Sequence, residues 1–146
     1  MSGERSLIDA NVLVYALYAN AEQHTACRNL LGTATHSDAG LCVTSQVLAE
    51  FFSIVTNPKR VSDPRLPEEA IQAVEAILSL PGISVLSTPP DTPARWLELL
   101  RSHPVRGPAV YDVHLVATMQ ANDVRRIYTY NGADFAVFSD LEVVLP

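Results

Sequence analysis

The chain has 146 residues, a length that suits one compact domain over 1–146 with a single hydrophobic core. Its composition, 48% hydrophobic and 18% charged, excludes a largely disordered chain. The formal net charge of −6 argues against a protein that holds nucleic acid mainly through phosphate contacts, although bound divalent cations would offset a cluster of carboxylates.

The expected compartment follows from the N-terminus, the hydropathy pattern and the cysteines. No apolar run approaches the roughly 20 residues that span a bilayer, so we expect no membrane segment. The N-terminus lacks the apolar stretch and cleavage site of a signal peptide. Cys27 and Cys42 are the only cysteines, and isolated thiols are typical of buried small hydrophobic residues. We therefore expect a cytoplasmic protein.

Strand-like and helical patterns alternate along the whole chain. The first half predicts a strand at 6–8, helical segments at 11–18 and 22–31, a polar loop at 33–40, a strand at 41–43, and a helix that Thr44 or Ser45 caps and Asn57-Pro58 ends. The second half predicts helices at 68–80, 92–100 and 109–121, strands at 83–86, 127–129 and 142–145, and a turn at Asn131-Gly132. This alternation predicts a three-layer α/β/α sandwich around a central, mainly parallel sheet.

Asp9 ends the first predicted strand. Open α/β sheets bind ligands beyond the carboxyl ends of their strands, so Asp9 is a candidate metal ligand. On this residue alone, a role as N-cap of the following helix is the stronger interpretation.

Two further acidic residues lie on or beside apolar helical stripes. Glu50 follows Val47 by three residues and directly precedes Phe51. A carboxylate at such a position is paired, protonated, metal-bound or extended to water. Asp112 leads the stripe of its own helix near the N-terminus, where the helix dipole also favours a negative charge. For both residues the structural and the functional interpretations remain open.

The segment after the strand at 127–129 adds polar groups at the same sheet edge. Thr129 offers a hydroxyl, Asn131 an amide and Asp134 a carboxylate. Taken alone, this segment reads as an ordinary Asn-Gly turn in which Asp134 caps a short helical turn.

Together these positions place oxygen ligands near one edge of one sheet. Hard cations such as Mg²⁺ or Mn²⁺ prefer such ligands, whereas Zn²⁺ usually recruits His or Cys. The four histidines show no ligand-like pairing, and His114, two residues from Asp112, points elsewhere on a helix, so we expect it to be non-catalytic.

Four sequence blocks resemble the PIN-domain ribonucleases and, among them, the VapC-type toxins of type II toxin–antitoxin pairs. The blocks are Leu7–Leu13 (LIDANVL), Ser45–Phe51 (SQVLAEF), Tyr111–Ala117 (YDVHLVA) and Thr129–Phe135 (TYNGADF). Each block is a weak signal, but their order and spacing over nearly the whole chain make a strong one.

The resemblance implies a sheet of about five strands, a homodimer, an antitoxin partner and an endoribonuclease that depends on Mg²⁺ or Mn²⁺. The resemblance implies that Asp9 and Asp112 bind the metal. It also implies that Glu50 is an essential acid of the same pocket and that Thr129 lies beside the metal. We expect Asn11, Ser45 and Asn131 to support this pocket as well. Many family members have a fourth acid at the position of Asn131, and Asp134 is the candidate replacement.

The proposed reaction is the hydrolysis of an RNA phosphodiester. The metal would activate water and stabilise the transition state, with Glu50 and Asp134 completing the coordination or orienting the water. Arg106, before the helix at 109–121, is a possible phosphate contact, although an exposed structural arginine is the stronger interpretation. The alternative function is a non-catalytic RNA- or partner-binding protein with a weakened metal site.

Two other phosphoryl-transfer families share such a sheet, and the sequence argues against both. A receiver domain needs a late lysine, and the only lysine is Lys59. A haloacid-dehalogenase-like phosphatase usually has an acid two residues after its nucleophilic aspartate, where this chain has Asn11.

Overall fold

A parallel sheet forms the centre of the computed structural model, which describes residues 4–146. Its strands are β1 (Ser6–Ile8), β2 (Leu41–Val43), β3 (Ile83–Val85), β4 (Arg126–Tyr128) and β5 (Glu142–Val144). They lie in the order β3-β2-β1-β4-β5, and every neighbouring pair is parallel. The predicted fold class is confirmed. The predicted absence of a signal peptide concerns in part residues 1–3, which lie outside the described residues.

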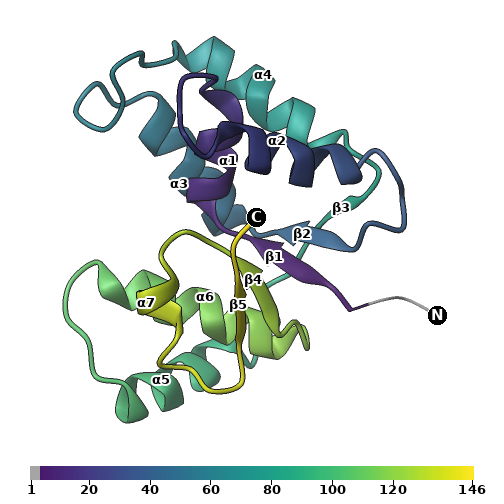
Figure 1. The fold of residues 1–146 in the computed structure, drawn as a ribbon. Coiled ribbons are helices and arrows are strands. Elements are labelled where there is room, and N and C mark those ends of the chain that lie inside the picture. Colours follow the sequence, from purple (N-terminus) through teal and green to yellow (C-terminus); the bar gives the residue numbers. More distant parts are fainter. Residues whose placement is uncertain (1–3) are drawn as a thin grey trace.

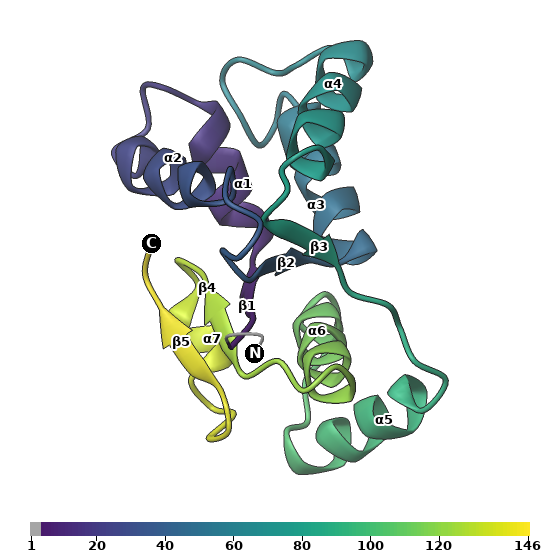
Figure 2. The same cartoon turned by 90° about the vertical axis from the view of Figure 1, so that its right-hand side faces the viewer.

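Helices cover both faces of this sheet. They are α1 (Ala10–Leu17), α2 (His24–Thr33), α3 (Ser45–Val55), α4 (Pro67–Leu78), α5 (Thr92–Ser102), α6 (Ala109–Ala121) and α7 (Gly132–Phe135). The first four lie on one face and the last three on the other, so the molecule has three layers (Figures 1 and 2). Within residues 4–146 no helix has the length and apolar character needed to cross a membrane.

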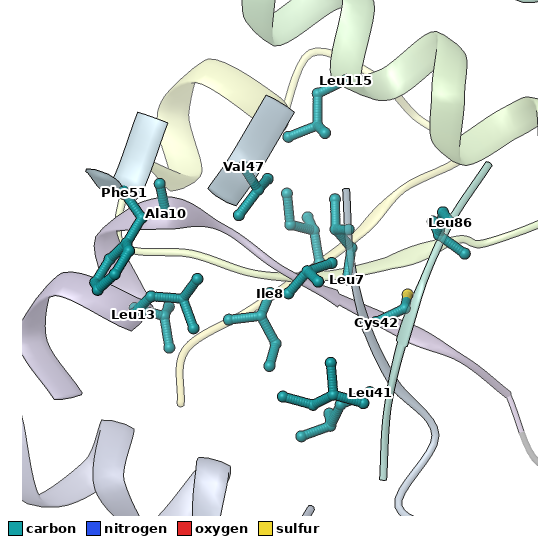
Figure 3. Close-up of a cluster of buried hydrophobic side chains, with 14 of the residues drawn as sticks. Leu7, Ile8, Ala10, Leu13, Leu41, Cys42, Val47, Phe51, Leu86 and Leu115 are labelled. Carbon is teal, nitrogen blue, oxygen red and sulfur yellow. The ribbon is translucent and has the colours of Figure 1, made fainter. Parts of the chain in front are cut away.

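The core forms because the central strands carry mainly apolar side chains, which are covered by helices on both faces of the sheet. Leu7 and Ile8 of β1 are fully buried, as are Cys42 and Val43 of β2. Figure 3 shows side chains from helices of both layers around these strands, among them Val47 and Phe51 of α3 and Leu115 of α6; Val47 is fully buried.

The two cysteines behave as small hydrophobic residues. Both thiols are free and buried, and burial raises the pKa of Cys42 to about 12. The thiol of Cys42 is therefore protonated and unreactive at neutral pH.

Side-chain caps mark where α1 and α3 begin. Asp9 caps α1 by accepting the Ala10 amide, and Thr44 caps α3 by accepting the Val47 amide at 3.0 Å. Of the two predicted capping residues for α3, the cap is therefore Thr44, and Ser45 is the first residue of the helix.

The strand order places a switch point between β1 and β4. The chain leaves β1 through α1 and α2 to reach β2 on one side, and β4 arrives on the other side from α5 and α6. Ligands of open α/β sheets bind where the strand order reverses in this way. Asp9 and Thr129, the residues that follow β1 and β4, therefore lie at the expected binding position.

Candidate active site

Asp9 lies at the carboxyl edge of the sheet, where the strands end, and hydrogen bonds hold its side chain in place. It is buried, with its Oδ1 accepting the Ala10 amide at 2.8 Å. Its Oδ2 accepts the Thr129 hydroxyl at 2.8 Å and the Asn11 amide at 3.2 Å. Burial raises the pKa of this carboxyl, and the hydrogen bonds from Thr129, Ala10 and Asn11 oppose that rise. Asp9 thus acts as a helix cap and remains a candidate ligand, because a carboxylate offers about four acceptor positions.

Asn11 and Thr129 connect the start of α1 to the loop after β4, beside Asp9. The Asn11 amide nitrogen also donates to Thr129 Oγ1 at 3.2 Å, and its oxygen accepts the Tyr130 backbone amide at 3.1 Å. Thr129 Oγ1 in turn accepts the Asn131 amide at 3.0 Å. The loop after β4 is therefore fastened to the start of α1, which fixes the orientation of the Asp9 carboxylate.

Three further carboxylates gather around Asp9. Burial raises the pKa of Asp112 to about 6, and the negative charges of Asp9 and Asp134 contribute. Glu50 is exposed as a whole, yet burial of its carboxyl group and the charges of Asp9 and Asp112 raise its pKa, while Arg60 lowers it. Asp9 and Asp112 therefore form the centre of the acidic cluster, with Glu50 and Asp134 at its periphery.

The three surrounding carboxylates have no internal partner. No group among residues 4–146 donates a hydrogen bond or forms an ion pair to the side chain of Glu50, Asp112 or Asp134 within the usual distance limits. Like charges brought together without a counter-charge repel, and each ionised group costs free energy. Such a cluster is typical of a site that binds a cation.

The donor chemistry fits a hard divalent ion, although the spacing does not form a preformed cage. Within residues 4–146 no three His, Cys, Asp or Glu side chains are arranged to surround a metal ion. Mg²⁺ does not require such a cage, because it is usually held by one or two carboxylates and keeps several waters. Asp9 and Asp112 are the residues of this chain that would hold it, and all donors are oxygens.

The other predicted residues lie at different distances from the cluster. Asp134 is inside α7 rather than at its cap, and its charge acts on Asp9 and Asp112. Asn131 is the N-cap residue of α7 and is exposed. Ser45 and Arg106 are exposed, and neither forms a side-chain hydrogen bond or ion pair with the cluster within residues 4–146. Their predicted roles stay predictions.

Sequence reasoning missed Gln46, which lies beside the cluster. Its amide contacts the Tyr111 carbonyl and the His114 ring, at 2.9 and 3.0 Å. The only sequence signal is its position four residues before Glu50, which puts both residues on one helix face. The partner of the His114 ring is thus an amide, and the expectation that His114 is non-catalytic stays a prediction.

The sheet order and an acidic cluster at its switch point define a PIN-like α/β/α domain. A family model, described as PIN domain, matches residues 6–141. Ribonuclease VapC43 of Mycobacterium tuberculosis is 33% identical over 116 residues, which cover 80% of this chain and 79% of the relative. Ribonuclease VapC48 of the same species is 25% identical over 138 residues, covering 92% of each chain.

Solved structures show the same fold. The VapC20 toxin of Mycobacterium tuberculosis, described as cleaving the sarcin–ricin loop, superimposes with a TM-score of 0.70 at 18% identity, covering 97% of this chain and 99% of that one. VapBC2 of Rickettsia felis, bound to a promoter DNA fragment, gives a TM-score of 0.65 at 18% identity, covering 96% and 97%.

The chain therefore belongs to the PIN-domain family, and within it to the VapC ribonucleases. The predictions of a PIN fold and of a ribonuclease are confirmed by this family membership. PIN-domain nucleases of this group generally depend on divalent metal ions.

Proposed function

We propose that residues 1–146 form one PIN domain that acts in the cytoplasm as the toxin of a toxin–antitoxin pair. It hydrolyses RNA phosphodiester bonds with Mg²⁺ or Mn²⁺ at the acidic cluster. The observation that supports this proposal best is the set of carboxylates without internal partners around Asp9.

Each acidic residue has an assigned part in this proposal. Asp9 and Asp112 hold the ion, because their charges are central in the cluster and Asp9 is fixed by hydrogen bonds. Glu50 and Asp134 complete the coordination or orient the attacking water. When bound, a divalent ion supplies Lewis-acid stabilisation of the charge that develops on phosphoryl oxygens. Asn11 and Thr129 hold Asp9 in place, and Arg106 contacts the RNA backbone.

The experiment that tests this proposal measures RNA cleavage with and without divalent ions. The substrates are structured RNAs, including the sarcin–ricin loop hairpin that VapC20 cleaves. We expect cleavage with Mg²⁺ or Mn²⁺, none with excess chelator, and a loss of at least about 100-fold in the Asp9→Asn and Asp112→Asn variants.

The matched control is Asp140→Asn, which removes an exposed carboxylate from the loop before β5. It should cleave RNA as the wild type does. Cleavage that persists in both Asp9→Asn and Asp112→Asn, or that ignores chelator, would reject the assigned site. Absence of divalent-ion binding in calorimetry at millimolar concentration would support the non-catalytic alternative.

We also propose an antitoxin partner and a homodimer. Structural neighbours include a VapBC2 assembly, a toxin–antitoxin complex from Klebsiella pneumoniae and FitAB bound to a DNA fragment. An acidic cluster without internal cations suits an arginine inserted by such a partner, since guanidinium and carboxylate pair in a bidentate manner. Co-purification with the product of a short neighbouring reading frame, and inhibition of cleavage by it, test the partner. Light scattering tests the dimer.

A further inference from the structure

The first turn of α6, which carries Asp112, is tied to two other helices through its backbone carbonyls. Gln46 Nε2 of α3 donates to the Tyr111 carbonyl at 2.9 Å. Trp96 Nε1 of α5 donates to the Val110 carbonyl at 3.2 Å. Both bonds reach this turn from neighbouring helices, in addition to the hydrogen bonds within α6 itself.

The Gln46 amide can take only one orientation in this arrangement. A carbonyl oxygen accepts and never donates, so the NH₂ group must face Tyr111. The amide oxygen then accepts from His114 Nδ1 at 3.0 Å, which makes that ring nitrogen the donor. Trp96 packs edge-on against the His114 ring, with centroids 5.7 Å apart, and limits the ring's movement.

The Gln46 bond lies beside the acidic cluster. Gln46 precedes Glu50 by four residues on α3, so the two side chains share one helix face. Tyr111 directly precedes Asp112 on α6. The two helices belong to opposite layers of the sandwich (Figure 2), so the bond connects the layers beside two of the carboxylates.

The hydrogen bond from Gln46 to Tyr111 can maintain a spacing between α3 and α6 that the carboxylates themselves do not maintain. Burial raises the pKa of Glu50, and the negative charges of Asp9 and Asp112 raise it further, because these groups repel one another when ionised. Within residues 4–146 no hydrogen bond reaches the Glu50 or Asp112 carboxylate to hold it in place. The spacing between α3 and α6 must therefore be maintained by groups outside the cluster.

We propose that Gln46 is a positioning residue that fastens the Asp112 turn of α6 to the Glu50 face of α3, with His114 fixing the orientation of its amide. This inference rests on the proposed function, because the spacing matters only if Glu50 and Asp112 act on one bound ion. Gln46 itself touches neither ion nor RNA in this role.

The test compares Gln46→Met, which keeps the length of the side chain and removes both hydrogen bonds, with Gln72→Met at an exposed position of α4. Calorimetry with Mn²⁺, steady-state RNA cleavage and amide hydrogen exchange of the metal-free protein are the measurements. We expect Gln46→Met to weaken Mn²⁺ binding about 10–100-fold, as is usual for residues that orient metal ligands. It should lower kcat more than it changes KM, and it should speed exchange at residues 113–116.

A second pair of variants separates the hydrogen bond from simple packing. His114→Asn retains an N–H donor near the position of Nδ1 and should keep most of the Mn²⁺ affinity, whereas His114→Leu should behave like Gln46→Met. Wild-type affinity and wild-type exchange in Gln46→Met would overturn the inference, as would equal behaviour of Gln46→Met and Gln72→Met.

The outcomes also distinguish this inference from the proposed function. If the wild-type protein bound no Mn²⁺ and cleaved no RNA, the proposed function would fail, and with it the role of Gln46 in metal binding. The exchange measurement on metal-free protein would still show whether the hydrogen bond from Gln46 to the Tyr111 carbonyl stabilises the first turn of α6. If the wild type binds and cleaves while Gln46→Met does so equally well, only the positioning role is wrong.

Discussion

Among residues 4–146, charged side chains are arranged differently at the two ends of the parallel strands: they form ion pairs at one end and an unpaired acidic cluster at the other. At the amino edge, where the strands begin, Arg126 lies between two acids, with Nε 3.0 Å from Glu142 and Nη2 3.6 Å from Glu4. At the carboxyl edge, where the strands end, four carboxylates gather and none forms an ion pair within residues 4–146. Between these edges, the central strands β1 and β2 are buried at every position.

This difference separates charges that support the fold from charges kept for a ligand. In an ion pair each charge has a partner of opposite sign, so the charges at the amino edge require no bound ion to balance them. A cluster of like charges costs stability, and proteins keep such local conflicts mainly at functional sites. The predictions below test whether the carboxyl edge depends on a cation and the amino edge does not.

The largest effect is expected at Thr129. Thr129→Val keeps the shape of the side chain and removes the hydroxyl that donates to Asp9 Oδ2 and accepts the Asn131 amide. We expect divalent-ion affinity to fall about 10–100-fold, because the group that orients a metal ligand is lost. Calorimetry with Mn²⁺ measures it. Thr129→Ser retains the hydroxyl and serves as the control, and equal affinities in the Val and Ser variants would contradict the prediction.

A smaller effect is expected at the periphery of the cluster. Asp134→Asn removes a charge that acts on both Asp9 and Asp112, so we expect roughly tenfold weaker binding of Mn²⁺. Asn131→Asp restores an acid at the position where many family members have one, and in the Asp134→Asn background it should recover that affinity. If Asp134→Asn binds Mn²⁺ like the wild type, Asp134 takes no part in the site.

The metal-free protein should gain stability when Asp112 loses its charge. Folding raises the pKa of this carboxyl from 3.8 to about 6, so the folded state binds the proton more tightly than the unfolded state does. The resulting stabilisation is complete below pH 3.8 and is lost as the pH rises through about 6. At pH 7.5 in chelator we therefore expect Asp112→Asn to raise the free energy of unfolding by about 1–2 kcal/mol.

Urea denaturation at two pH values checks this prediction. The advantage of Asp112→Asn over the wild type should shrink between pH 7.5 and pH 4.5, because protonation neutralises the wild-type carboxyl in the folded state. Asp140→Asn, at the exposed position outside the cluster, should show no such change. A wild-type protein that is the more stable one at pH 7.5 without metal would contradict the proposed repulsion.

Much of the fold was predictable because its signals are local. Buried strands such as 6–8 and 41–43 consist mainly of apolar residues, and capping residues such as Thr44 mark where some of the helices begin. The predicted bounds differ from the observed ones by a residue or two, as with the helix expected over 22–31 and observed as α2 over His24–Thr33. End turns of helices depend on few hydrogen bonds, so such shifts are expected.

The site was predictable only in part, because its geometry depends on contacts between distant segments. The positions of Asp9 and Asp112 followed from strand ends and helix stripes. The bond between Thr129 and Asp9 joins residues 120 positions apart, and that between Gln46 and Tyr111 joins residues 65 apart. Helical or strand periodicity in the sequence does not predict such contacts between distant residues. Asp134 also illustrates this limit, since its sequence context fits an ordinary turn, and only the packing of α7 brings its charge to the cluster.

The amino edge provides the complementary prediction, which is also the smallest. Arg126→Gln removes both ion pairs with Glu4 and Glu142 while keeping a polar side chain. Exposed pairs contribute little, so we expect Tm to fall by no more than about 4 °C and RNA cleavage and Mn²⁺ affinity to stay unchanged. Thermal unfolding and calorimetry measure both. A clear loss of Mn²⁺ affinity would mean that charge at the amino edge influences the cluster across the sheet, and the separation of the two edges would then be wrong.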